Sequence, residues 1–365
     1  MTFQNALQGD HSKKNIGQET KDKDNAPFVS VIVPCRNEVE YISMFLESVV
    51  NIEYPRDRLE VLVIDGMSTD GTREILNRYQ KEFNFVRILD NTLRFTPQAL
   101  NLGIKTARGE IVIRMDVHAC YQKDYIQKCV KYLMECDADN VGGTIITSAS
   151  KNTLTAKGIA CALSSIFGAG RSYFRIGSKR PRYVDTVFGG CYRRELFEAV
   201  GLFNENLKRC QDIEFNLRLK RRGYKTLLIP EIKAFYFPSS NLSNFIKHKF
   251  VDGIWALKSF CYTNAMPVTI RSLLPLMFVI VLGSLLILGT IKSLFFNLFL
   301  ILITIYLFIN LIFSFDIALK HRNIRLLISN FVSFCALHFS YGLGSLTGLL
   351  CLLKCRIESL VSRGK

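Results

Sequence analysis

The chain has 365 residues, a formal net charge of +16 and 49% hydrophobic residues. It is longer than one average domain, and a mean hydropathy of +0.18 is high for a wholly soluble protein, so we expect a membrane part beside a folded domain. The positive charge suits a phosphate-bearing substrate or an anionic lipid surface. We expect no nucleic-acid partner, because no recognition-helix, zinc-finger or aromatic-basic RNA-binding signature accompanies that charge.

Cysteine usage and the amino-terminal composition indicate a compartment. Eleven cysteines, from Cys35 to Cys355, form no C-x-x-C pair, which favours buried free thiols under reducing conditions. Residues 1–26 are polar, carry charges of both signs and have no apolar core, so we expect a disordered leader and not a secretory signal. The folded part should therefore lie in the cytosol.

Strand-like and helix-like patterns alternate in the first half of residues 27–240, which we expect to form one catalytic domain. Helical periodicity follows at 41–50 and 72–81, and a helix capped by Thr96 should end before Gly109. The alternation predicts an α/β domain with a parallel sheet covered on both faces. The apolar runs expected to be its strands are residues 29–33, 61–64, 85–89 and 111–115.

The second half of this domain is less regular. Residues 149–181 are rich in serine, glycine and basic side chains, and we expect an insertion or mobile loop over the site. A strand is expected at 183–188, and helices at 193–200 and 212–222.

Apolar residues at helical spacing in 241–265 predict an amphipathic helix. With lysines around the stripe, it suits the surface of an anionic membrane, and a packed helix of the catalytic domain is the alternative. The stripe consists of Leu242, Phe245, Ile246, Phe250, Ile254, Leu257 and Cys261, and the lysines are Lys247, Lys249 and Lys258.

Residues 270–355 predict a membrane domain. Segments 273–291, 294–315 and 326–353 contain no Asp, Glu, Lys or Arg and are long enough to cross the hydrocarbon layer. Only two residues separate the first two segments, so a tight hairpin should place the basic link that follows in the cytosol. A full third crossing would leave the basic tail, 356–365, outside. Because three glycines interrupt that segment, a re-entrant or broken helix is the alternative; they are Gly342, Gly344 and Gly348.

Three motifs with carboxylates follow the expected strands, at the edge where open α/β sheets bind nucleotides. They are P-C-R-N-E at 34–38, V-I-D-G-M-S-T-D-G-T at 63–72 and R-M-D-V-H at 114–118. Asp65 could accept a hydrogen bond from the imide of a uracil, or it could belong to a helix-capping loop with Ser68, Asp70 and Thr72. Arg36 and Glu38 could form only a surface ion pair.

The third motif suits a divalent metal, because an oxygen and an imidazole nitrogen on alternate residues of an extended chain point the same way. Asp116 and His118 would hold Mn²⁺ or Mg²⁺ against phosphates, although a lone histidine is usually structural. Asp212 opens a helix, where its ionised form could deprotonate an attacking hydroxyl, or it is a plain first-turn acid. Gly189 and Gly190, upstream, lack side chains and could leave room for a sugar.

Taken together, these residues resemble the family 2 inverting glycosyltransferases over residues 28–238, with Asp-x-His in place of Asp-x-Asp. The stretches F-G-G-C-Y-R-R-E-L-F-E-A-V-G-L-F-N-E at 188–205 and Q-D-I-E-F-N-L-R-L at 211–219 are similar to the acceptor half. The resemblance implies a GT-A, Rossmann-like nucleotide-sugar domain followed by transmembrane helices. It also implies that Pro34, Arg36 and Glu38 line the nucleotide pocket.

The same resemblance implies that Asp65 reads the base, Asp116 serves the ribose and the metal, His118 the metal, and Asp212 deprotonates the acceptor. The Asp-x-His variant and the membrane segments are most similar to the succinoglycan-type exopolysaccharide branch, whose members extend a lipid-linked sugar on the cytosolic face of the inner membrane. A processive polysaccharide synthase is the first alternative, although the Q-x-x-R-W motif is missing and the only tryptophan is Trp255. The second is a non-catalytic scaffold that only binds sugar nucleotides.

Overall fold

The computed structural model describes residues 26–263 and 270–363, and the chain folds into two compact units. We call the first the sheet unit; it contains the described residues up to Ile145, together with Gly177–Glu205 and Arg218–Tyr236. The second, the helical unit, contains Ile146–Ile176, Asn206–Leu217 and the described residues from Phe237 onward.

The sheet unit is built on a nine-stranded sheet with the order β3-β2-β1-β4-β8-β6-β9-β5, in which β7 pairs with β9. β1, β2, β3 and β4 are parallel neighbours, as the alternating pattern predicted, and the pairs formed by the later strands are antiparallel. The strands are β1 Val29–Cys35, β2 Leu59–Asp65, β3 Val86–Asp90, β4 Ile111–Arg114, β5 Ala119–Tyr121, β6 Asn140–Thr147, β7 Arg182–Tyr183, β8 Phe188–Arg193 and β9 Thr226–Tyr236.

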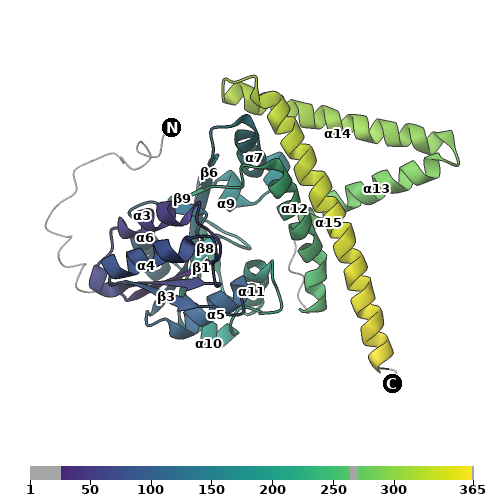
Figure 1. Cartoon of the computed structure of the whole chain (residues 1–365). Helices are drawn as coiled ribbons and strands as arrows, with labels where there is room; N and C mark the ends of the chain where they lie inside the picture. Colours follow the sequence, from purple (N-terminus) through teal and green to yellow (C-terminus); the bar gives the residue numbers. More distant parts are fainter. Residues whose placement is uncertain (1–25, 264–269, 364–365) are drawn as a thin grey trace. The chain divides into compact units, whose positions relative to one another are not determined.

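Helices cover both faces of this sheet, with α3, α4 and α6 on one face and α5 and α10 on the other (Figure 1). β1 and β2 are almost completely buried, as strands between two helical layers must be. The helices are α3 Ile42–Val50, α4 Thr72–Glu82, α5 Thr96–Thr106, α6 Tyr125–Glu135 and α10 Glu195–Val200, and Arg56–Arg58 is a 3₁₀ turn. The expected α/β class is confirmed.

Two local predictions need correction, and a third is confirmed. Phe95, and not Thr96, is the residue before α5, and no side chain caps that helix. The single strand expected at 183–188 is wrong, because its residues are divided between β7, which pairs with β9, and β8, which pairs with β4 and β6. The helix expected at 212–222 is confirmed as α11, Gln211–Arg221, and Gly223 follows it with a φ of +85°.

The insertion expected at 149–181 forms three helices of the helical unit. They are α7 Leu154–Ser164, α8 Ile166–Ala169 and α9 Tyr173–Ile176. Ile159 and Leu163 of α7 pack in one apolar cluster with Phe245 and Leu337, so the expectation of a mobile loop is wrong for these residues. Small side chains explain the difference: a Cβ added at Gly158 would lie 2.3 Å from Ser329 Oγ, which is a distance that only glycine permits.

Four long helices complete the helical unit: α12 Leu242–Lys258, α13 Leu274–Gly289, α14 Ser293–Lys320 and α15 Leu326–Arg363, with 3₁₀ turns at Ser259–Cys261 and Ile270–Leu273. Among the described residues, α14 and the Leu326–Glu358 part of α15 are long and apolar enough to cross a membrane, whereas α13 is a shorter apolar helix. The broken third segment is not found, since α15 is continuous through its glycines.

Those glycines instead allow close helix packing. A Cβ added at Gly344 would lie 2.0 Å from the carbonyl oxygen of Phe250 in α12, and one at Gly348 would lie 2.3 Å from that of Ile254. One at Gly342 would lie 2.5 Å from the carbonyl oxygen of Pro275 in α13. The glycines that suggested a helix break therefore let the backbones of α12 and α13 lie close to that of α15.

We expect Gly344→Ala to destabilise the helical unit by about 1–3 kcal/mol, because α12 and α15 must move apart to admit the methyl group. The matched control is Gly283→Ala in α13, where the added Cβ would meet nothing within 4 Å. Alanine has the higher helix propensity, so the control should be neutral or slightly stabilising. Thermal unfolding of the full chain in detergent measures both, and equal melting temperatures would contradict the close contact.

Candidate active site

The three motifs of the first half follow neighbouring parallel strands. β1 lies between β2 and β4, and the register pairs Cys35 with Asp65 and Ile32 with Arg114. The segments that follow these strands therefore lie at one edge of the sheet, where open α/β sheets bind ligands. We call residues 34–41, 65–73 and 114–118 the edge loops.

Hydrogen bonds join the first two edge loops. The amide of Asn37 donates to Ser68 Oγ at 2.9 Å, and Asn37 Oδ1 accepts from the amide of Thr69 at 2.9 Å. The amide of Glu38 donates to Thr72 Oγ1 at 2.8 Å. Asn37 has a φ of +52°, in the left-handed region that asparagine tolerates better than most residues. The two loops are thus joined by hydrogen bonds of the chain itself.

Asp65 is 1% exposed at the end of β2 and its carboxylate already has partners. Ser68 Oγ donates to Oδ1 at 2.6 Å, and Arg73 Nη1 lies 3.0 Å from Oδ2. Asp70 Oδ1 accepts from the amide of Thr72 at 3.1 Å, so the contacts of the helix-capping alternative are present. A carboxylate oxygen can accept more than one hydrogen bond, so these contacts leave Asp65 able to accept another.

Arg36 lies across the start of the second edge loop. A Cβ added at Gly66 would lie 3.0 Å from Arg36 Cδ, and Arg36 Nη1 donates to the carbonyl oxygen of Arg94 at 3.4 Å. Pro34, in β1, pairs in register with Ile64. Glycine at position 66 therefore lets the arginine stem pass close to the backbone.

Glu38 pairs with His118, not with Arg36. His118 Nε2 lies 3.1 Å from Glu38 Oε2, and the ring of Tyr41 lies 4.9 Å from the His118 ring, centroid to centroid. Burial raises the pKa of Glu38 to about 8, and the negative charges of Asp70 and Asp116 add to the increase. The edge loops thus concentrate carboxylates around one imidazole.

Asp116 and His118 lie on a turn and not on an extended strand, because β4 ends at Arg114 and the amide of Ala119 donates to the carbonyl oxygen of Asp116 at 3.2 Å. Arg114 Nη2 lies 3.0 Å from Asp116 Oδ1, and the amide of Asp116 donates to the hydroxyl of Tyr121 at 2.8 Å. Among the described residues, no group of three or more His, Cys, Asp or Glu side chains could hold a metal. In this structure Asp116 is paired with Arg114, and His118 is paired with Glu38.

Gly189 and Gly190 lie in β8, which pairs with β4, and both have positive φ values, +73° and +103°. A Cβ at Gly189 would lie 2.7 Å from the carbonyl oxygen of Arg114, and one at Gly190 would lie 2.3 Å from the hydroxyl of Tyr192. Protein atoms therefore occupy the space that a side chain at either position would need. The positive φ values by themselves also favour glycine.

Asp212 belongs to the helical unit, at the start of α11. Its Oδ1 accepts from the amide of Ile213 at 2.9 Å, which uses a free donor of the first turn. Three residues earlier, Arg209 Nη1 lies 2.9 Å from Asp252 Oδ1 of α12, and Lys249 Nζ lies 2.8 Å from the other oxygen of Asp252. An ion-pair cluster thus ties the segment with Asp212 to α12.

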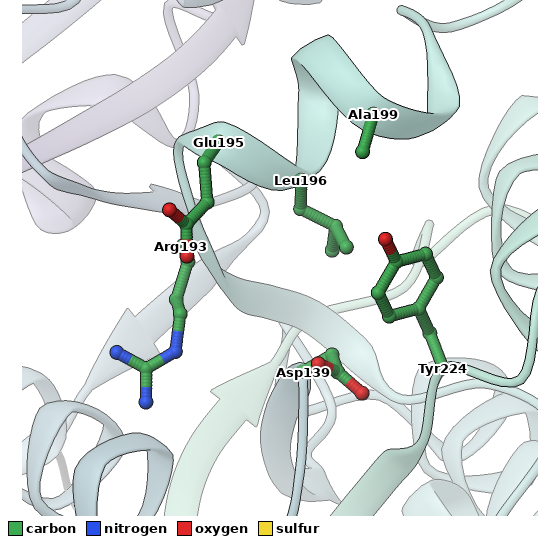
Figure 2. Close-up of a pocket in the computed structure, with 6 residues that line it drawn as sticks. All are labelled: Asp139, Arg193, Glu195, Leu196, Ala199 and Tyr224. Atoms are coloured by element: carbon green, nitrogen blue, oxygen red, sulfur yellow. The ribbon is translucent and has the colours of Figure 1, made fainter.

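A pocket of about 280 Å³ in the sheet unit lies away from the edge loops (Figure 2). Its lining residues are Asp139, Arg193, Glu195, Leu196, Ala199 and Tyr224. Arg193 pairs with Ile111, the first residue of β4, whereas the third edge loop follows the last residue of that strand. This pocket is therefore at the opposite edge of the sheet.

Four residues with clear contacts in the edge loops were missed from the sequence. Asn37 and Tyr41 flank residues that were chosen, but an amide and a phenol carry no distinctive spacing. Arg73 contacts Asp65 and Tyr121 contacts Asp116 in the folded chain, and no sequence pattern predicts either pair.

Comparison with known proteins agrees with this arrangement. Residues 30–201 match the family described as Glycosyl transferase family 2. The chain is 32% identical over 228 residues to the dolichyl N-acetyl-alpha-D-glucosaminyl phosphate 3-beta-D-2,3-diacetamido-2,3-dideoxy-beta-D-glucuronosyltransferase of Methanococcus voltae, covering 60% of this chain and 70% of the relative. It is 30% identical over 248 residues to the succinoglycan biosynthesis protein ExoA of Rhizobium meliloti (strain 1021), covering 67% and 74%.

A solved structure has the same fold over most of the chain. It is the mannosyltransferase PcManGT from Pyrobaculum calidifontis in complex with GDP-Man and Mn²⁺, with a TM-score of 0.58, 19% identity and coverage of 88% of this chain and 87% of that one. Strand order, motifs and relatives agree: the chain belongs to glycosyl transferase family 2 and has the GT-A fold.

Proposed function

We propose that this glycosyltransferase moves a hexose from a nucleotide diphosphate, UDP, to a hydroxyl of a membrane-held, lipid-linked saccharide during cell-surface or extracellular polysaccharide synthesis. The observation that carries the proposal is the convergence of three carboxylate-bearing edge loops at the carboxyl ends of β1, β2 and β4. That edge is the ligand-binding position of an open α/β sheet.

The donor would bind in the sheet unit. Pro34, Arg36 and Glu38 would line the nucleotide pocket, and Arg36 would contribute positive charge toward the phosphates. Asp65, held by Ser68 and Arg73, would accept a hydrogen bond from the imide of uracil. The hydrogen bonds from the amides of Asn37 and Glu38 to the second edge loop support a donor site whose backbone is held by the protein's own contacts.

The residues around Glu38 suit a divalent cation. The pKa of Glu38 is raised first by burial and further by the negative charges of Asp70 and Asp116, so a cation bound among these carboxylates would favour their ionised forms. Asp116 and His118 would hold Mn²⁺ or Mg²⁺ there, and the remaining ligands would come from phosphate oxygens. When bound, the cation would neutralise charge on the departing nucleotide diphosphate.

Asp212 would act as the base. Its carboxylate would take the proton of the acceptor hydroxyl while that oxygen bonds to the anomeric carbon and the bond to the nucleotide phosphate breaks. One displacement from the opposite face of the sugar inverts the anomeric configuration. Gly189 and Gly190 would contribute to the sugar site through the backbone of β8, whose conformation their positive φ values set.

The helical unit would attach the enzyme to the inner membrane in more than one pass, with the catalytic domain in the cytosol. Two helices of suitable length and composition support membrane attachment. A lipid-linked acceptor is supported by the relative from Methanococcus voltae, whose name specifies a dolichyl phosphate sugar. Confinement of enzyme and acceptor to one surface would raise their rate of encounter.

The test is a donor screen with the purified full chain and membrane lipid extract. Radiolabelled UDP-, GDP- and dTDP-sugars are supplied separately, and labelled lipid and released nucleotide are separated by chromatography. We expect label in the lipid fraction with a UDP-sugar, and slow UDP release without acceptor. If no donor gave either product, the protein would be a binding scaffold; long products would indicate a processive synthase.

We expect His118→Ala to weaken Mn²⁺-dependent binding of UDP by about tenfold or more, because loss of a ligand or its partner commonly costs 10–100-fold in metal affinity. Calorimetric titration with UDP, with and without Mn²⁺, measures the effect. UDP affinity in the absence of metal should change little and serves as the control. Wild-type metal dependence in the variant would remove His118 from the ligand set.

A further inference from the structure

The exposed apolar residues of α15 lie on one face. At 38 residues the helix is about 57 Å long, well beyond the roughly 30 Å of a hydrocarbon layer. Their spacings of 3, 4, 7 or 11 residues are close to whole numbers of helical turns, so they form one stripe, interrupted where Phe339 packs against Phe278 of α13 and Tyr306 of α14. All of them are exposed: Ile328, Val332, Leu343, Leu350, Leu353 and Ile357. One exposed stripe along a helix is typical of a helix in the membrane interface.

The opposite side of α15 is covered by α12. Phe245 packs with Leu337, and Ile254 lies against Gly348, so the two helices run in the same direction. A Cβ added at Gly253 would lie 2.2 Å from the carbonyl oxygen of Tyr341. α12 therefore lies along residues 337–348, the middle of the expected third membrane segment.

α12 places charged side chains beside the middle of α15. Asp252, next to Gly253 in the chain, pairs with Arg209 at 2.9 Å and with Lys249 at 2.8 Å. If α15 crossed the bilayer, these three charges would lie near its centre. Removing each charge from water there costs several kcal/mol, and the side chains of Arg209, Asp252 and Lys249 are partly exposed, at 43%, 25% and 20%. Arg209 would also carry the segment that contains Asp212 into the hydrocarbon.

α14 is covered by the protein much less than α15. Only 11% of its most apolar 18-residue stretch is buried inside the protein, against 39% for that of α15. α13 packs along α14, and the two helices form a hairpin. Exposed apolar residues surround this hairpin near its tip, among them Ile287, Ile291, Leu294 and Ile301. The hairpin is therefore suited to lipid on all sides, and α15 on one side only.

We propose that α15 does not cross the membrane but lies in its cytosolic interface, with the Ile328–Ile357 stripe against an anionic lipid surface. The α13–α14 hairpin alone enters the hydrocarbon. This deepens the proposed attachment, and its test is independent of catalysis. Basic residues are present at both ends of the stripe, where they complement anionic headgroups: Lys320, Arg322 and Arg325, and Lys354 and Arg356. All of them stay on the cytosolic side, which the positive-inside rule favours.

Depth measurements test this orientation. In the full chain with Trp255, the only tryptophan, replaced by phenylalanine, a new tryptophan is introduced by Val332→Trp or by Leu350→Trp. Quenching is measured in phosphatidylglycerol-containing vesicles with lipids brominated at different acyl positions. The two sites are 18 residues, or about 27 Å of helix, apart. We expect equal, shallow depths, with Phe308→Trp in α14 as the deep control.

A second measurement does not depend on the folding of the tryptophan variants. Epitope tags with a protease site are placed at the amino terminus, between Arg322 and Asn323, and after Lys365 of the otherwise unaltered chain. In sealed vesicles of defined orientation, we expect all three to be cleaved from the same side. Cleavage of the second or third tag only from the side opposite the first, or unequal depths of positions 332 and 350, would overturn the proposal.

Discussion

Asp212→Asn is expected to lower the rate of sugar transfer by about 10²- to 10⁴-fold, which is the usual contribution of a general base. Asparagine has nearly the same shape and can still accept the hydrogen bond from the amide of Ile213 that helps to fix the side chain. It cannot take the proton of the acceptor hydroxyl at neutral pH. Single-turnover transfer from a labelled UDP-sugar to lipid extract measures the loss.

Two controls separate chemistry from folding in that experiment. UDP affinity should stay near that of the wild type, because donor binding is assigned to the sheet unit. Glu74→Gln removes another acid from the first turn of a helix, α4, and should leave transfer unchanged. An Asp212→Asn enzyme that turns over at the wild-type rate would exclude Asp212 as the base.

The second large effect concerns stability. Glu60, at the start of β2, is 1% exposed and accepts hydrogen bonds from Ser30 Oγ and the amide of Arg108, both at 2.7 Å. Arg87 Nη1 lies 3.0 Å from its other oxygen. Replacing Glu60 with alanine leaves the buried hydroxyl and amide without their acceptor, and we expect a loss of about 3 kcal/mol.

The pH dependence should identify the cause. Burial acts to raise the pKa of Glu60, but the hydrogen bonds from Ser30 and Arg108 outweigh it and hold the pKa below its ordinary value of 4.5. The contribution of ionised Glu60 to the free energy of unfolding is therefore complete above pH 4.5 and is lost as the pH falls through the lower pKa of the folded state. Thermal unfolding of wild type and variant should converge in acid.

Because Glu60 lies at the edge of the sheet opposite the edge loops, Glu60→Ala should leave UDP affinity unchanged at temperatures where it is folded. Glu82→Gln, an exposed carboxylate on α4, is the neutral control. If Glu60→Ala unfolded with the wild-type midpoint at neutral pH, the network would have no structural role.

The sheet and the positions of the motifs could be predicted because burial leaves a direct mark on the sequence. β1 and β2 are buried on both faces, so they consist of continuous apolar runs, and a polar motif follows each run where the strand reaches the edge. The family resemblance rests on the same motifs. The length of two segments without charged residues also located α14 and α15, since long apolar helices can be recognised from composition alone.

The failures arise where tertiary contacts decide. Residues 149–181 resemble a loop in composition, but their small residues let α7 pack closely beside Ser329. Gly342, Gly344 and Gly348 suggested a broken helix, yet in α15 they admit neighbouring backbones. The turn at Asp116 and the pairing of His118 with Glu38 depend on how two loops meet, which no local pattern encodes.

The most direct measurement is photolabelling of the full chain with an azido derivative of UDP, in the presence of Mn²⁺, followed by peptide mapping. We expect labelled peptides from the edge loops, residues 34–41, 65–73 and 114–118, and protection by excess UDP. Labelling confined to the pocket around Arg193 and Tyr224, at the other edge of the sheet, would contradict the proposed donor site.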